Sequence, residues 1–175
     1  MRLLSRSYIS PIKTRIETVD TMKKDFTRDY TTEIFRAYAA AGMPTYEEAR
    51  ERVYKTELAK RDSMDAATAI AQAEIATEKR TPYLLDIMAA EKTLELLERG
   101  GKGMIARAVK AVYCAYPTQP LHRGDITNRV RRFSLECPAD TSTVYRWLKE
   151  ARLLCAAVRG LRISDDDVER YSIAL

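Results

Sequence analysis

Residues 125–156, DITNRVRRFSLECPADTSTVYRWLKEARLLCA, are the stretch that decides the fold. Its first part places three apolar side chains on one face of a helix: Ile126, Val130 and Phe133. Residues 134–139, with Pro138 among them, are expected to form a turn. Asp140 is a residue type preferred at helix N-caps, so a second helix should follow it. The stretch therefore predicts a helix-turn-helix.

The second of these helices, expected over residues 140–156, has two unlike faces. Its apolar residues recur every three or four positions: Val144, Trp147, Leu148, Ala151 and Leu154. On the other face, hydroxyl groups and Arg side chains can reach base edges in the DNA major groove, while flanking basic residues can hold phosphates. The candidate base-reading residues are Thr141, Ser142, Tyr145, Arg146 and Lys149. The candidate phosphate-contacting residues, which would orient the protein without specifying sequence, are Arg129, Arg131, Arg132 and Arg152.

Positive charge is concentrated around this stretch. The whole chain of 175 residues has a formal net charge of +5. Residues 99–162 hold 13 Lys and Arg against 4 Asp and Glu, a net of +9, whereas residues 1–98 hold 16 against 17. A segment so unbalanced attracts polyanions, because each neutralised phosphate releases condensed counterions. A solvated basic surface is the alternative that charge by itself leaves open.

The residues before this stretch also predict helices. A cap followed by proline at Ser10 and Pro11 starts an apolar stripe that runs to Tyr30, and Gly42 is a stop signal. Further helices are expected over residues 45–61, 65–78, 81–99 and 104–116, with caps at Thr45, Ser63 and Thr81. Because no stretch alternates apolar and polar residues as a strand does, the sequence predicts an all-α fold.

The helix expected over residues 65–78 is rich in alanine, with Ile70 and Ile75 as its only large apolar side chains. Such a segment gains little from burial, at roughly 25 cal/mol per Å² of apolar surface. We therefore expect a lightly packed arm or partner surface here.

The glycines at residues 100–103 mark the point where composition turns basic, and they suggest a division of the chain. Residues 1–99 would form a helical N-terminal region for oligomerisation or partner contact. Residues 100–163 would form the DNA-binding helix-turn-helix domain, and residues 164–175 an acidic C-terminal tail.

Several classes of protein are disfavoured by the residues that are scarce. Three Cys without a CxxC pair and a single His offer no zinc-ligand set, and the odd Cys count argues against a secreted disulfide framework. No apolar run approaches the roughly 20 residues that span a bilayer. The acidic residues 165–167 fit the first turn of a helix capped by Ser164 better than a metal site. With no nucleophile–base pair or acid–base pair evident, we expect a cytoplasmic, reduced, soluble protein that is not an enzyme and has no cofactor or metal.

The segment TSTVYRWLK at residues 141–149 resembles the recognition helix of sigma-factor region 4, in which a capped Ser/Thr-rich start precedes Val and a face of Arg and Lys. The helices expected over residues 104–116 and 125–133 stand in the order that such domains use. Residues 99–160 as a whole look like phage-encoded transcriptional regulators of the RinA and ArpU type, although Pro138 and the acidic tail depart from that pattern.

This resemblance implies sequence-specific binding to double-stranded DNA and activation of late phage genes at the nucleoid of a bacterial host cell. The N-terminal region would then contact RNA polymerase or form a homodimer. No membrane is expected among the partners.

Two other functions remain open on the same residues. A phage DNA-packaging or assembly component would use these helices to hold DNA or a multimer. A helical protein-interaction module would use chiefly the N-terminal half. Packaging subunits form large rings, whereas a regulator should be a monomer or dimer in solution.

Overall fold

The all-α prediction is confirmed by the computed structural model, which describes residues 26–163 together with Asp167 and Glu169. This part of the chain contains the helices α1 (Phe26–Ala40), α2 (Tyr46–Ala59), α3 (Ala66–Glu78), α4 (Thr81–Arg99), α5 (Gly103–Val112), α6 (Asp125–Glu136) and α7 (Thr141–Arg159). The predicted start signal at Ser10 and Pro11 lies outside the described residues, as does the proposed cap at Ser164.

Local caps account for several helix boundaries. The hydroxyl of Thr45 accepts a hydrogen bond from the Glu48 amide, and the Glu48 carboxylate accepts one from the Thr45 amide, which confirms the predicted capping box. The prediction that Ser63 caps α3 is wrong, because Asp65 caps it by accepting a hydrogen bond from the Thr68 amide. Thr81 is likewise no cap: it is the first residue of α4, and its hydroxyl donates to the Glu78 carbonyl.

The C-terminal ends of α5 and α7 differ from the predicted ones. α5 ends at Val112, four residues before the predicted end at Tyr116, and Tyr116 itself adopts a left-handed conformation with φ of 50° that a helix cannot include. α7 continues three residues beyond the predicted Ala156. It ends where Gly160, with φ of 78°, turns the chain and lets the Leu161 amide donate to the Ala156 carbonyl.

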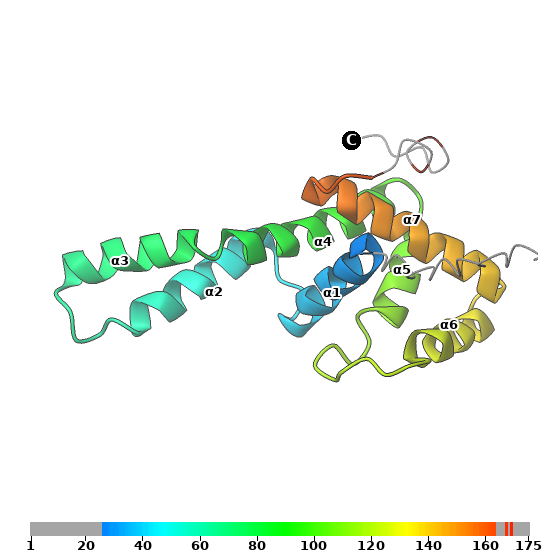
Figure 1. Ribbon diagram of the computed structural model, residues 1–175, viewed down its shortest axis with the longest axis horizontal. Helices are drawn as coiled ribbons and strands as arrows, with labels where there is room; N and C mark the ends of the chain where they lie inside the picture. The colour runs from blue at the N-terminus through cyan, green and yellow to red at the C-terminus, as the bar shows by residue number, and fades with distance from the viewer. Residues whose placement is uncertain (1–25, 164–166, 168, 170–175) are drawn as a thin grey trace, which may run out of the picture.

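The helices form a body and an arm, as Figure 1 shows. α2 and α3 pack against each other as a hairpin that projects from the body, and α4 continues from the base of this hairpin into the body. We call the α2–α3 hairpin the arm. Its α3 buries mainly small residues such as Ala69 and Ala73, whereas Ile70 and Ile75 are 45% and 54% exposed. The prediction of a lightly packed arm is confirmed.

The body has one apolar core built from α1, α4, α5, α6 and α7. Its largest buried side chains come from helices far apart in the sequence: Phe35, Ile87, Leu97, Val109, Val130 and Leu148. α4 packs against α1 and α7, and α5 packs against α6 and α7. The core is therefore continuous across the boundary predicted at residues 99 and 100.

A candidate nucleic-acid interface on α6 and α7

The turn between α6 and α7 is shorter than the sequence predicts. α6 continues past Phe133 to Glu136, so only residues 137–140 separate the two helices. Leu135, which the pattern places in the turn, instead stands on the last turn of α6 with 88% of its surface exposed. The predicted helix-turn-helix is present, with a tighter connection.

Asp140 shapes the first turn of α7. Its carboxylate accepts hydrogen bonds from the Thr143 amide at 2.6 Å and from the Ser142 hydroxyl at 2.9 Å, which confirms the predicted N-cap. The bond from the Thr143 backbone is the main reason that the pKa of Asp140 lies below its usual value. The cap fixes this turn while leaving Thr141 and Ser142 exposed.

The predicted inward stripe of α7 is confirmed at its centre. Val144, Leu148 and Ala151 are fully buried in the core of the body. Trp147 and Leu154 are only partly buried and pack at the edge of this core. The opposite side of the N-terminal half of α7 is consequently directed to solvent.

Four of the five candidate base readers lie on that open side: Thr141, Ser142, Tyr145 and Arg146 are exposed. The Tyr145 hydroxyl donates to the Thr127 hydroxyl on α6 at 3.2 Å, which ties the two helices together beside the turn. The Arg146 guanidinium donates to the Thr143 hydroxyl at 2.9 Å. Lys149 differs from these four, because its Nζ is 2.8 Å from the Asp167 carboxylate and the side chain is partly buried.

The candidate phosphate contacts also separate into two groups. Arg131 and Arg132 are exposed on α6. Arg129 instead donates to the carbonyls of Val112 and Ala115, at 3.0 and 2.7 Å, so that it closes the C-terminal end of α5. Arg152 is partly buried, with Nε donating to the Leu148 carbonyl at 3.2 Å. Residue type alone therefore grouped side chains that the fold uses differently.

Arg36 is an important residue that the sequence reasoning missed. This α1 side chain is only 6% exposed, and its guanidinium donates to the carbonyls of Pro117 at 3.2 Å and Gln119 in the loop before α6. Together with Arg129 it holds the loop that positions the helix-turn-helix. No local pattern indicates this role, because the partners lie more than 80 residues further along the chain.

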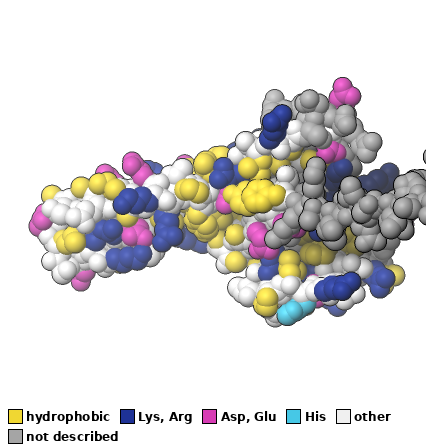
Figure 2. Space-filling model, in the orientation of Figure 1, with side chains coloured by type: hydrophobic (Ala, Val, Ile, Leu, Met, Phe, Trp, Pro, Cys, Tyr) yellow, Lys and Arg dark blue, Asp and Glu magenta, His cyan; other side chains and the backbone are white. Residues whose placement is uncertain are grey.

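Basic side chains mark the end of the body where α6 lies (Figure 2). The exposed cations near the helix-turn-helix include Arg123, Arg131, Arg132 and Arg146. This surface has the charge that a DNA backbone requires.

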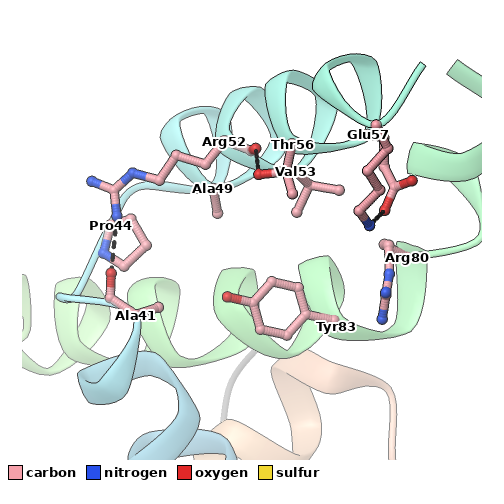
Figure 3. Close-up of a pocket in the computed structure, with 10 residues that line it drawn as sticks. Ala41, Pro44, Ala49, Arg52, Val53, Thr56, Glu57, Arg80 and Tyr83 are labelled. Carbon is pink, nitrogen blue, oxygen red and sulfur yellow. Dashed lines mark hydrogen bonds and ion pairs between the residues drawn. The ribbon is translucent and has the colours of Figure 1, made fainter. Parts of the chain in front are cut away.

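A separate hollow lies at the base of the arm, between α2 and the start of α4 (Figure 3). It has a volume of about 340 Å³, and the Tyr83 ring faces Ala49 and Val53 across it. Its carboxylate, Glu57, already accepts hydrogen bonds from Lys60 and Arg61. The lining offers contact to an apolar group and contains no nucleophile paired with a base.

The described residues bring together no group of three or more His, Cys, Asp and Glu side chains that could hold a metal ion. Among the helices of this part of the chain, none combines the length and apolar character that a membrane crossing requires.

Comparisons with protein-family models, with curated proteins and with solved structures find no match for this chain.

Proposed function

We propose that this protein is a sequence-specific, double-stranded-DNA-binding regulator of transcription. The observation that carries the proposal is the open first part of α7, where Thr141, Ser142, Tyr145 and Arg146 are exposed beside a short turn and a basic α6. The resemblance to regulators of the RinA and ArpU type implies the biological context. The protein would activate late phage genes by acting on RNA polymerase at a promoter, in the nucleoid of a bacterial cell.

The division of labour between the two helices follows from the chemistry of DNA. A guanidinium such as that of Arg146 can donate two hydrogen bonds to the O6 and N7 atoms of guanine, while hydroxyls can bond to several base edges. Arg131 and Arg132 on α6 would contact phosphates, which orient the protein but carry no sequence information. The buried stripe of α7 holds the reading side chains on a rigid helix.

The arm is the part of the described chain that we assign to a protein partner, either RNA polymerase or a second copy. Its exposed Ile70 and Ile75 and the hollow beside Tyr83 support this assignment. The molar mass of the purified protein in solution, measured by light scattering, distinguishes the regulator from the packaging alternative. A regulator should be a monomer or dimer, whereas a packaging component should form a large ring.

The deciding experiment is binding to labelled duplex fragments from the protein's own genomic neighbourhood, with a salt titration and random-sequence competitor. One fragment should bind tightly in the presence of competitor, and log affinity should fall linearly with log salt. Equal, weak binding to every fragment would leave only a basic surface and would overturn the proposal.

Two variants test the roles of the residues. Arg146→Ala should lower affinity for the preferred fragment about 5- to 150-fold and relax its specificity, as expected for loss of a base contact. Arg132→Ala should weaken binding to all sequences alike and reduce the salt slope by about 0.9. Arg50→Ala, at an exposed arginine on the arm, is the matched control and should leave binding unchanged.

A further inference from the structure

The charges of the arm are sorted onto two opposite sides. Residues 45–80 hold eight Asp and Glu against seven Lys and Arg, so the arm and its ends are nearly neutral as a whole. Several of these side chains line two hollows that have no lining residue in common. On α2, Arg52 belongs to one hollow and Arg50 to the other, and residues two apart on a helix do not share a side. The two hollows therefore open on opposite sides of the arm.

The hollow beside Tyr83 has an apolar middle, where the ring faces two aliphatic side chains of α2, and a basic end (Figure 3). Glu57 lies at the basic end, where it already pairs with Lys60 at 2.7 Å and with Arg61 at 3.1 Å. Arg80 lies at the same end, is exposed, and has no ion-pair partner among the residues that the structure describes. Its guanidinium is therefore available to a carboxylate from another molecule.

A ridge of complementary character runs along α3. Ile70, Glu74 and Glu78 follow one another at steps of four residues, so they project on one side of this helix. Ile70 is 45% exposed. Both carboxylates are exposed, and neither has an ion-pair partner in the described part of the chain. We call these three residues the α3 ridge.

The groove beside the α3 ridge, of about 860 Å³, is acidic as well. Its lining contains five carboxylates and one guanidinium: Glu47, Glu48, Glu51, Glu74, Glu78 and Arg50. Glu51 pairs with Lys55 at 2.7 Å. The carboxylate of Glu48 is engaged in the capping box of α2. When these two are set aside, three carboxylates still face one guanidinium, so this side of the arm keeps an excess of negative charge.

The spacing of the α3 ridge matches that of the hollow. Glu74 lies about one helical turn from Ile70, a rise of about 6 Å along α3, and Arg80 lies about one turn from Tyr83, a rise of about 4.5 Å. When Ile70 of one copy packs against Tyr83 of another, with α3 antiparallel to α4, Glu74 comes opposite Arg80. Glu78 extends the negative row by a further turn. The volume of the hollow, about 340 Å³, exceeds that of an isoleucine side chain.

We propose that the α3 ridge of one copy of this protein docks in the hollow beside Tyr83 of a second copy, with Ile70 in the apolar middle and Glu74 paired with Arg80. An amphipathic helix in an apolar groove is a recurring mode of recognition, and the flanking charges select the partner. Because the ridge and the hollow lie on opposite sides of the arm, the contact is heterologous, and a dimer keeps one free ridge and one free hollow. This contact deepens the proposed function, on which it rests for the role of the arm: of the two partners considered there, it selects a second copy.

Sedimentation velocity of the full chain, over about 1–200 µM protein at low and at physiological salt, measures the association. Wild-type protein should associate as its concentration rises, and more strongly at low salt. Ile70→Ser should weaken the association about tenfold, because it removes the apolar anchor. Ile75→Ser is the matched control, since this exposed isoleucine of the same helix lies five positions on and projects on another side, and it should behave as wild type. A wild type that stays monomeric throughout, or equal losses for the two serine variants, would overturn the proposal.

Exchange of charge tests the ion pair between the copies. Arg80→Glu and Glu74→Lys should each weaken the association about tenfold or more, because like charges then face each other. A mixture of these two variants should associate again, as should the double variant that carries both changes. Glu136→Lys, at an exposed carboxylate on α6, makes the same change in net charge as Glu74→Lys and should have no effect. Far-UV circular dichroism verifies that each variant is folded. A mixture that associates no better than either variant alone would refute the pairing.

The titration with labelled DNA separates this contact from the proposed function. If the copies associate as expected while no fragment is bound specifically, the contact stands and the DNA-binding function fails. If a protein that stays monomeric over the whole concentration range binds DNA specifically, the function stands and the contact is refuted. A closed ring of fixed size that Arg80→Glu disrupts would support the contact and would favour the packaging alternative over a regulator.

Discussion

Two leucines on α6 and α7 give a matched test of how these helices pack against the body. Leu148 on α7 is 1% exposed and belongs to the core of the body, whereas Leu135 on the last turn of α6 is 88% exposed. The same substitution at both positions, leucine to alanine, removes the same atoms from opposite environments. We expect Leu148→Ala to destabilise the protein strongly and Leu135→Ala to leave its stability almost unchanged.

The magnitude follows from what each side chain contacts. Truncation of Leu148 removes three buried carbons, at about 0.8 kcal/mol each, which gives about 2.4 kcal/mol for transfer alone. The cavity that remains raises the expected loss to about 3–5 kcal/mol, because a close-packed core relaxes only in part. Leu135 is already in water, and alanine has a slightly higher helix propensity, so its truncation should stay within about 0.5 kcal/mol.

Urea unfolding of the full chain, followed by circular dichroism at 222 nm, measures both losses. With a slope of about 2 kcal/mol per molar urea, a loss of 3 kcal/mol moves the midpoint of Leu148→Ala down by about 1.5 M. The midpoint of Leu135→Ala should move by less than about 0.3 M. Equal shifts for the two variants, or a loss below about 1 kcal/mol for Leu148→Ala, would refute the arrangement of α7 described above.

Three further predictions concern the cysteines and one ion pair of the body. Native protein should react with iodoacetamide at the partly exposed Cys137 and spare the buried Cys114 and Cys155, as mass spectrometry can show; modification of Cys155 at the rate of Cys137 would contradict this. Burial raises the pKa of Cys114 from 9.0 to about 11 and that of Cys155 from 9.0 to about 12. As the pH rises, these thiols therefore lose their protons in the unfolded chain before they do so in the folded protein. The free energy of unfolding should consequently fall as the pH rises from about 9 to 11. Asp86→Asn should lower the free energy of unfolding by about 1–3 kcal/mol, because Asp86 accepts from Arg159 at 2.5 Å and joins α4 to α7; unchanged thermal and urea midpoints would disprove this role.

Features with local causes were predictable from the sequence. The caps at Thr45 and Asp140 bond to amides three residues away, so the residues that decide them stand side by side in the chain. The buried stripe through Val144 and Leu148 follows from helical spacing in the same way. The prediction of Ser63 as the cap of α3 was wrong because a second residue suited to capping, Asp65, lies directly before the helix.

Features with distant causes were not predictable. Arg129 and Arg131 are both arginines on α6. The guanidinium of Arg129 donates hydrogen bonds to carbonyl groups at the end of α5, whereas the side chain of Arg131 is exposed. Lys149 has the helical position expected of a base-reading residue, but its Nζ pairs with the carboxylate of Asp167, beyond the end of α7. Only the three-dimensional arrangement separates such side chains.

The continuous core has a practical consequence for anyone who would dissect this protein. A polypeptide that started at residue 100 would keep α5, α6 and α7 but lose α1 and α4, against which α7 packs. Cys155, fully buried on α7 and close to Thr93 of α4, is among the side chains that such a fragment would leave without a neighbour. We therefore expect that α5, α6 and α7 would not fold stably alone, because α7 packs against α1 and α4 as well as against α5 and α6.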